Sequence, residues 1–354
     1  MRDLTVLITA AGSPSMPGLA TCLKHNGERN IKLIGTDMNS DATIGQIVDV
    51  VRYAPPASSD DYVDCLLKIC EEEHVDILIP GISQELPKLQ ARQNEFKKIG
   101  TKVSICDGEG LLITNDKIRL YEYMQENGFN IPNFTVAHTL EEFRDGCRKI
   151  GYPEKAICVK IKDGSGSRGV RIIDPNKSRF DIFVGEKPNS FFTTYMDMLS
   201  ILEEAEEFPE LLIMDYLPGV EYSVDLLAEH GKVLYICGRE SNVISASIPQ
   251  EATLSYNQEA YEIATRLVEK LNLDGNIDMD FKCDSQGHLQ LMEINPRLAA
   301  TLSVIAAGGM NLIYLRVKQL LGEDMPKCDV KYGVKLKRRY HELFCDEDGK
   351  VIKL

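Results

Sequence analysis

The sequence of 354 residues lacks the groupings that mark metal-dependent redox or histidine chemistry. Its six histidines form no H-x-x-x-H or H-x-E cluster, so a zinc site or a catalytic histidine has no support. Ten cysteines are spread from Cys22 to Cys345 without any C-x-x-C pair, and several lie in apolar runs such as residues 157–159. We therefore expect reduced, buried thiols and no disulfide framework.

Positive charge and long apolar runs are also scarce. The chain has 40 Lys and Arg against 54 Asp and Glu, a formal net charge of -14, which repels nucleic acids and anionic lipids at long range. No run approaches the roughly 18 to 20 apolar residues that span a bilayer, and the first residues turn polar too early for a secretory signal. We expect a cytoplasmic protein with no nucleic-acid and no membrane partner.

The first 112 residues alternate short apolar runs with amphipathic stretches, which is typical of a doubly wound parallel sheet. A helix is predicted over residues 61–73, where Val63, Leu66, Leu67 and Cys70 recur at helical spacing. The predicted strands cover residues 6–8, 31–34, 77–79 and 103–105.

Beyond residue 112 the chain changes from α/β to α+β. A helix opens at residues 114–117 and ends before Gly128, and the next starts with a capping box in which Thr139 accepts from the Glu142 amide. Further helices are predicted near residues 194–207 and 258–271. Strands joined by short polar turns are predicted at residues 157–162, 170–173, 211–217, 221–228, 232–237, 277–283 and 289–294.

The strongest local pattern is a glycine-rich loop between two strands, at residues 159–170. Three glycines and two serines let backbone amides approach an anion closely, and cations flank them. The loop lacks the G-K-[S/T] ending of a Walker loop, so that mechanism is rejected, while a plain flexible hairpin turn remains an alternative. Strand alternation places Cys158, Lys160 and Lys162 on one face, so that a cation projects beside the loop.

A second pattern is an acidic hairpin at residues 276–297. If the turn after Cys283 closes a regular antiparallel hairpin, Asp280 and Glu293 lie diagonally on one face and Asn295 follows on that face. Two carboxylates and an amide oxygen are ligands suited to Mg²⁺ that phosphates also hold, although solvated edge carboxylates are the alternative. Arg297, just after a proline, is placed to stabilise charge on a transferred phosphoryl group.

Taken in order, these segments resemble the ATP-grasp superfamily, and most closely ligases similar to the large subunit of carbamoyl-phosphate synthetase. The resemblance covers nearly the whole chain. It rests on Lys117 at a helix start, Lys160 before the Gly/Ser loop, the turn at residues 215–221, Asp280, and the Glu293-x-Asn295-Pro-Arg297 run. It implies a domain at residues 1–112 followed by two α+β grasp subdomains at residues 113–214 and 215–354.

The resemblance also implies residue roles, with ATP and Mg²⁺ (or Mn²⁺) as cofactors. Lys117 and Lys160 would hold phosphates under a mobile loop, the backbone of residues 215–217 would receive adenine, and Glu221 would bind ribose. The implied ATP-binding set is Lys117, Lys160, Gly164, Ser165, Gly166, Ser167, Gly169, Asp215, Tyr216, Leu217 and Glu221. The implied metal ligands are Asp280, Glu293 and Asn295, and the implied catalytic residues are Arg297, Lys160 and Arg239, the last also a substrate candidate.

Two departures from the family pattern stand out. Met214 and Asp215 replace the Glu and Lys of several family members, which puts side-chain contacts to adenine in doubt. The stretch from residue 174 to 209 is longer than usual, and we expect its aromatic residues 191–196 to serve packing.

The implied activity is an ATP-dependent carboxylate–amine ligase that forms an acyl phosphate from a small carboxylate and passes it to an amine; a homodimer is one candidate assembly. The alternatives are a non-catalytic ATP-binding or regulatory protein, and an enzyme that phosphorylates bicarbonate or carbamate. A NAD-dependent oxidoreductase is a remote alternative, because Asp37 stands where a ribose acid would, although the Gly12 to Gly18 spacing does not fit G-x-G-x-x-G.

The acceptor substrate is expected near loops at the carboxyl ends of the N-terminal strands, residues 11–18 and 81–85. Glu85 is a candidate for binding a substrate ammonium, against the simpler interpretation of a solvated glutamate at a helix start. Near the other end of the chain, Lys335, Lys337, Arg338 and Arg339 line either the active-site cleft or only its rim.

Overall fold

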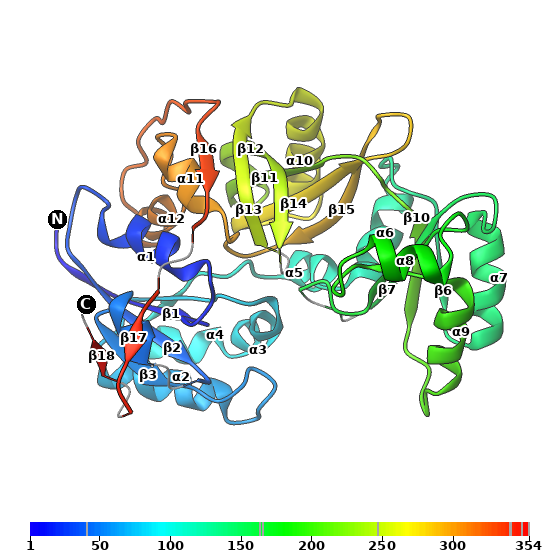
Figure 1. Cartoon of the computed structure of the whole chain (residues 1–354). Helices are drawn as coiled ribbons and strands as arrows, with labels where there is room; N and C mark the ends of the chain where they lie inside the picture. The colour runs from blue at the N-terminus through cyan, green and yellow to red at the C-terminus, as the bar shows by residue number, and fades with distance from the viewer. Residues whose placement is uncertain are drawn as a thin grey trace. The chain divides into compact units, whose positions relative to one another are not determined.

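The computed structural model describes residues 1–39, 42–162, 164, 166–245, 248–339, 342–347 and 350–352 (Figure 1). The chain forms two compact units. Unit 1 contains residues 1–115, 222–280 and 294–354, and unit 2 contains residues 116–221 and 281–293. Compactness thus groups the first and last parts of the chain together, and the predicted three-domain division stays a prediction.

Unit 1 begins with a five-stranded sheet in the order β3-β2-β1-β4-β5, in which every pair is parallel. This confirms the predicted doubly wound domain, since helices connect the strands (Figure 1). Its strands are β1 (Leu4–Thr9), β2 (Ile31–Asp37), β3 (Val50–Tyr53), β4 (Ile77–Ile79) and β5 (Lys102–Val103). Its helices are α1 (Met16–Lys24), α2 (Tyr62–Glu72), α3 (Leu86–Ala91), α4 (Gln93–Lys98) and α5 (Glu109–Thr114), with 3₁₀ turns at Ala42–Gln46 and Ser83–Glu85.

A second sheet has six strands in the order β15-β14-β11-β12-β13-β16. Its strands are β11 (Glu221–Glu229), β12 (Lys232–Ser245), β13 (Ile248–Ser255), β14 (Gly275–Cys283), β15 (Leu289–Asn295) and β16 (Lys335–Lys337). The associated helices are α10 (Gln258–Lys270), α11 (Leu302–Ala307) and α12 (Leu312–Leu321), and a short ribbon pairs β17 (Phe344–Cys345) with β18 (Val351–Ile352).

One hydrophobic core joins the two ends of unit 1. Met16, Leu19 and Leu23 of α1 belong to the same buried cluster as Leu302 of α11 and Leu315 of α12. Burial of such side chains contributes roughly 1.5–3 kcal/mol each, so the parallel sheet and the C-terminal helices stabilise one another.

Unit 2 contains a five-stranded sheet in the order β6-β10-β7-β8-β9. Its strands are β6 (Phe134–Ala137), β7 (Ile157–Ile161), β8 (Val170–Ile173), β9 (Phe192–Thr193) and β10 (Leu211–Asp215). Its helices are α6 (Lys117–Glu126), α7 (Leu140–Ile150), α8 (Arg179–Gly185) and α9 (Tyr195–Glu203).

The two faces of β7 belong to different cores, as strand alternation predicts. Ile157 and Val159 lie in a cluster with Phe143 of α7, whereas Cys158 lies in a separate cluster with Tyr121 of α6.

The predicted helix starts in unit 2 are also present. Asp116 caps α6, because its side chain accepts from the backbone amides of Ile118 and Arg119. At the start of α7, Thr139 accepts from the Glu142 amide at 3.1 Å. The predicted capping box is only half formed, since the Glu142 carboxylate accepts from the amide of His138 instead of that of Thr139.

All ten cysteines are free thiols, as predicted, and six of them are buried; Cys345 is the exposed exception. Burial raises the pKa of the Cys22 and Cys106 thiols to about 11. No helix in the described part of the chain is long and apolar enough to cross a bilayer.

Candidate active site

Lys160 is a buried cation near the end of β7, just before the glycine-rich loop. It is only 4% exposed, opposite Leu212 of β10 and Val170 of β8. No hydrogen-bond or ion-pair partner holds its ammonium group among the residues that the structure describes. The next lysine on that face, Lys162, is instead paired with Glu210 at 2.6 Å. The side chain of Lys160 is thus largely covered, while its ammonium group is left without a protein partner among the described residues, and its predicted phosphate contact stays a prediction.

The loop after β7 has an unusual backbone. Gly166, Ser167 and Gly169 all adopt positive φ angles, of 60°, 59° and 70°. The left-handed region is uncommon for a serine, and such strain gathers at ligand-binding sites. A Cβ on Gly169 would lie 2.4 Å from the Ile161 side chain, so only glycine fits there. Ser165, also predicted to bind ATP, lies outside the described residues.

Lys117, at the start of α6, donates from its ammonium group to the carbonyl of Gly164. The structure therefore places Lys117 against the glycine-rich loop, and its predicted contact with phosphate stays a prediction. Unit 2 alone supplies two lysines and the loop.

The predicted adenine-binding turn follows β10. The Asp215 carboxylate accepts from the Asn133 backbone amide at 3.0 Å, from the Asn133 side chain at 2.8 Å and from Lys155. These partners hold the turn in place, so the Asp215 side chain has a structural function within unit 2. The backbone contacts predicted for Tyr216 and Leu217, and the ribose contact of Glu221, stay predictions.

Aromatic residues of the long insertion pack within unit 2, as expected. The Phe192 ring meets Tyr216 edge-on at 6.2 Å, and Tyr195 stacks on Tyr152 at 4.9 Å. Desolvation on burial raises the pKa of Tyr216. Helix α8 of the same insertion was not predicted, because it buries none of its side chains and so shows no apolar periodicity.

The predicted metal ligands lie on β14 and β15. Asp280 accepts a hydrogen bond of 2.6 Å from Ser223 of β11, and the Asn295 side-chain oxygen accepts one of 3.3 Å from Arg297. Glu293 stands two positions before Asn295 on β15, so both belong to one face of that strand. No group of three or more His, Cys, Asp or Glu side chains arranged for a metal occurs within the described ranges. The predicted set of two carboxylates and an amide would need further oxygens, from a bound phosphate or water, to complete the coordination shell of Mg²⁺.

Arg239 lies in a buried ion network of the six-stranded sheet. It is 3% exposed, and its three guanidinium nitrogens donate to Asp225 at 2.8 Å, to Ser241 at 3.2 Å and to Asp278 at 3.1 Å. Burial tends to lower the pKa of Arg239, but the carboxylates of Asp225, Asp278 and Asp280 raise it on balance. The geometry favours a structural function for Arg239, and its predicted catalytic or substrate role stays a prediction.

Two arginines converge on the turn after β15. Arg297 donates to the Leu298 carbonyl at 2.6 Å, and Arg338 donates to the Ala300 carbonyl at 2.7 Å. Neither has a carboxylate partner among the described residues. Burial and repulsion from Arg239 lower the pKa of Arg338. Backbone carbonyls of the turn thus orient two cations without neutralising them. The sequence identified Arg338 only as part of a basic tail.

Glu85 corrects one interpretation of the sequence. It is not a solvated helix-start residue, since its exposure is 0%. One carboxylate oxygen accepts from Thr9 at 2.6 Å and from the amides of Gly81 and Ile82 at 2.8 and 2.9 Å, and the other accepts from the Tyr62 hydroxyl. These four donors use the carboxylate internally, so the structure offers no support for a contact with a substrate ammonium.

Asp37 has a similar internal use. Its carboxylate accepts from the Gly12 amide at 2.9 Å and from the Asn39 amide at 2.9 Å. These bonds fix the loop after β1, where a dinucleotide ribose would have to compete with them. The geometry of Asp37 therefore does not support the remote oxidoreductase alternative.

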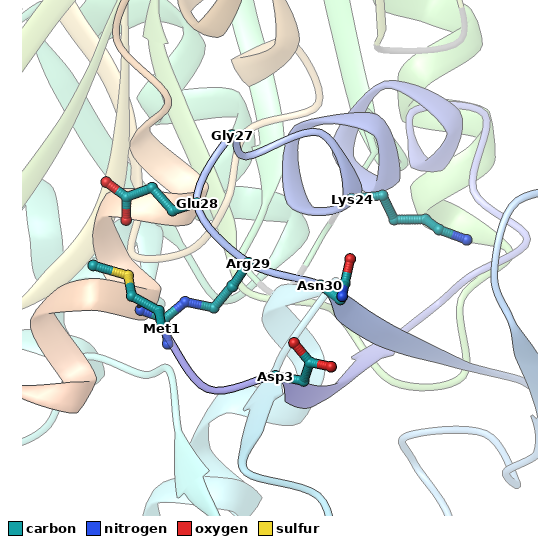
Figure 2. Close-up of a pocket in the computed structure, with 7 residues that line it drawn as sticks. All are labelled: Met1, Asp3, Lys24, Gly27, Glu28, Arg29 and Asn30. Carbon is teal, nitrogen blue, oxygen red and sulfur yellow. Dashed lines mark hydrogen bonds between the residues drawn. The ribbon is translucent and has the colours of Figure 1, made fainter.

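A pocket of about 440 Å³ lies at the amino ends of β1 and β2, lined by Met1, Asp3, Lys24 and residues 27–30 (Figure 2). Figure 2 shows Arg29 directed toward Met1, and Arg29 also pairs with Glu323. This edge is opposite to the carboxyl edge that carries Asp37, and none of the predicted site residues lines the pocket.

Two family models match parts of the chain. Residues 6–104 match "PylC-like, N-terminal domain", and residues 207–340 match "ATP-grasp in the biosynthetic pathway with Ter operon".

Similar curated proteins include carbamoyl phosphate synthase large chains. The arginine-specific large chain of Bacillus subtilis is 21% identical over 321 residues, which are 86% of this chain and 28% of that protein. The large chain of Archaeoglobus fulgidus is 24% identical over 302 residues, which are 80% of this chain and 25% of that protein. The chain thus spans about a quarter of the length of these relatives.

Solved structures share the fold over most of the chain. An ADP complex of N5-carboxyaminoimidazole ribonucleotide synthetase matches with a TM-score of 0.65 and 15% identity, covering 93% of this chain and 79% of that one. Biotin carboxylase from Campylobacter jejuni matches with a TM-score of 0.67 and 17% identity, covering 92% and 73%. An L-amino acid ligase from Bacillus licheniformis matches with a TM-score of 0.61 and 15% identity, covering 91% and 75%.

The matched segments include part of what the sequence resemblance singled out, whereas Lys117, Lys160 and the glycine-rich loop lie between them. The parallel sheet lies in the PylC-like segment, and β14, β15 and Arg297 lie in the ATP-grasp segment. Residues 6–104 are therefore similar to a PylC-like N-terminal domain, and residues 207–340 are similar to an ATP-grasp domain.

Proposed function

We propose that the chain is an ATP-dependent ligase that activates a small carboxylate as an acyl phosphate and joins it to an amine. The observation that carries the proposal is Lys160, a residue that is 4% exposed, beside a glycine-rich loop, whose ammonium group has no protein partner among the described residues. A cation on a largely covered side chain, with no carboxylate beside it, is suited to bind an anionic ligand such as a nucleotide phosphate.

We assign the nucleotide phosphates to unit 2. Lys160 and Lys117 supply charge, and the positive φ angles of Gly166, Ser167 and Gly169 suit a loop whose backbone amides bind an anion. The turn after β10, held by the Asp215 contacts, supplies backbone groups for the adenine.

A divalent cation fits the chemistry of the acidic face. Asp278 and Asp280 lie beside the buried Arg239 together with Asp225, whose pKa burial raises. We propose that Asp280, Glu293 and Asn295 would hold Mg²⁺ or Mn²⁺ together with phosphate oxygens. When bound, the metal ion neutralises charge on those oxygens.

In the proposed reaction a substrate carboxylate oxygen attacks the γ-phosphorus of ATP, the bond to the bridging oxygen breaks, and ADP leaves. An amine nitrogen then attacks the acyl carbon, phosphate departs with the bonding electrons, and the nitrogen loses a proton. Arg297 and Arg338 are suited to bind the carboxylate and the phosphoryl oxygens, because no carboxylate of the described residues neutralises them.

The test measures ADP release from ATP and Mg²⁺ with a panel of amino acids as carboxylate and amine. We expect Lys160→Met and Glu293→Ala to lower the rate at least about a hundredfold. Lys160→Met should also raise the free energy of unfolding by about 1 kcal/mol, since it removes an unpaired buried charge. Lys162→Met, which alters a partly exposed and paired lysine, serves as the control and should gain no stability.

Unchanged ADP release in both variants would overturn the assignment. ATP binding without ADP formation for any carboxylate would favour a non-catalytic regulatory protein. Bicarbonate is a second candidate carboxylate, because the similar proteins include carbamoyl phosphate synthases and a biotin carboxylase. ADP release that depends on bicarbonate alone would favour it.

A further inference from the structure

Arg297 has one hydrogen bond that reaches far along the sequence. Its Nε donates to the Ser83 hydroxyl oxygen at 3.1 Å, while its other nitrogens bond the neighbouring groups Leu298 and Asn295. Ser83 lies in the loop after β4, in the parallel-sheet part of unit 1. Among the hydrogen bonds of the described residues, this one ties the guanidinium to an element outside its own turn.

Hydrogen bonds to Glu85 and Thr9 fix the loop that carries Ser83. Gly81 and Ile82 donate their amides to the buried Glu85 carboxylate, and Gly81 also donates to the Thr9 hydroxyl at 2.8 Å. A Cβ on Gly81 would lie 2.4 Å from the Thr9 carbonyl oxygen, so the loop approaches β1 as closely as glycine allows. The resulting loop has little freedom to shift, and the Ser83 hydroxyl is a fixed acceptor.

We propose that Ser83 is a positioning residue for Arg297, and that the Glu85 network holds Ser83 in the place where it orients the guanidinium. The proposal rests on the function proposed above, in which Arg297 contacts the transferred phosphoryl group. Such a cation lowers the barrier only when it is aligned before the reaction, because reorienting it at the transition state would cost part of its stabilisation.

The kinetic test compares Ser83→Ala with Ser83→Thr, using ADP release with the most active pair from the amino-acid panel. Ser83→Ala should lower kcat about tenfold, the loss expected for a hydrogen bond to a charged group, with KM for ATP within about twofold of wild type. Ser83→Thr keeps the oxygen and should restore most of the rate. Ser58→Ala, an exposed serine of the same unit, is the matched control and should leave kcat unchanged.

A double-mutant comparison separates alignment of Arg297 from a general effect of the loop. In the Arg297→Ala background, Ser83→Ala should produce no further loss of kcat, because Ser83 acts only through its hydrogen bond to Arg297. Equal losses in both backgrounds would overturn the positioning function while leaving the proposed ligase activity intact. A wild-type rate in Arg297→Ala would instead remove Arg297 from the proposed chemistry.

A readout without substrate keeps the inference testable even if no panel member reacts. The Nε–H signal of Arg297, assigned by its loss in Arg297→Lys, should exchange with water severalfold faster in Ser83→Ala than in wild type or Ser58→Ala, as measured by NMR. Equal exchange in all three proteins would show that Ser83 does not hold the guanidinium and would overturn the inference.

Discussion

The buried charged side chains of this protein differ in the partners that surround them. Arg239 is surrounded by carboxylates and a serine, so its burial is compensated within the chain. Lys160 has no such compensation among the described residues. Glu85 lies between these cases, because it is fully buried and bonded by four donors, of which none is a cation. The first arrangement is typical of a structural ion network, and the second is the one that we propose for binding phosphate.

Glu85 should make stability fall as pH rises. Burial raises its pKa in the folded protein above the ordinary 4.5, despite the hydrogen bonds that lower it. The folded state then binds more protons than the unfolded state at pH above 4.5, so the free energy of unfolding decreases through this window. Glu85→Gln removes the titration, and its stability relative to wild type should increase from about pH 4.5 toward neutrality, as measured by urea unfolding.

The matched control for this pH series is Glu141, an exposed carboxylate in the first turn of α7. Glu141→Gln should leave the pH dependence of stability as it is in wild type, because that carboxylate is solvated in both the folded and the unfolded state. Parallel curves for wild type and Glu85→Gln over the same pH range would contradict the buried-carboxylate account.

At the scale of the element, the glycine-rich loop requires a backbone conformation that glycine adopts most easily. Gly169 has a φ of 70°, where an L-residue costs about 1–2 kcal/mol, and an added methyl group would meet Ile161. We expect Gly169→Ala to displace the loop and raise the Kd for MgATP at least about tenfold. Isothermal titration calorimetry measures this Kd.

Gly185 at the end of α8 provides the matched control. An added Cβ there meets nothing within 4 Å, and its φ is not in the left-handed region. Gly185→Ala should bind MgATP as wild type does. A Gly169→Ala protein with wild-type affinity would mean that the loop conformation contributes nothing to nucleotide binding.

Elements with a clear apolar period could be predicted, and those stabilised by other means could not. The range 77–79 matches β4, and residues 61–73 bracket α2, because both segments bury a regular set of side chains. By contrast, α8 is held by its Ser178–Asp181 capping bonds and exposes Phe183, so no buried stripe is present in its sequence. Strand β12 runs to Ser245, well beyond the predicted end at residue 237.

The site residues were predictable only where a family pattern fixes them. The motif order pointed to Lys117, Lys160 and Asp280, and the structure shows a hydrogen bond that holds Lys117 and one that holds Asp280. Ser83 had no such signal, because its importance arises from a contact across 214 positions of sequence. Spacing along a chain does not encode contacts of that range, and they become visible only in the folded molecule.

At the scale of the whole molecule, the core of unit 1 predicts how fragments behave. Residues 1–115 alone would expose the α1 side chains that pack on α11 and α12, including Leu19 and Leu23. This fragment should bind a hydrophobic dye and elute as aggregates in size-exclusion chromatography. Residues 116–221 contain a complete cluster of buried residues between Ala137 and Ile213, and should elute as a compact monomer.

A monomeric, dye-free fragment 1–115 would show that the parallel sheet is stable without the C-terminal helices. Addition of a separately purified fragment of residues 222–354, which contains the rest of unit 1, is a stricter version of the experiment, since it should suppress dye binding only if α11 and α12 cover that face.

The shared core also has a consequence for synthesis on the ribosome. The partners of α1 lie near residues 302–317, so nearly 300 further residues must be translated before they emerge. At about 5–20 residues per second, the nascent sheet waits roughly 15 seconds to one minute with its apolar helix uncovered. Throughout that interval we expect chaperones to bind the growing chain. The rate of translation should then affect how much folded protein is obtained.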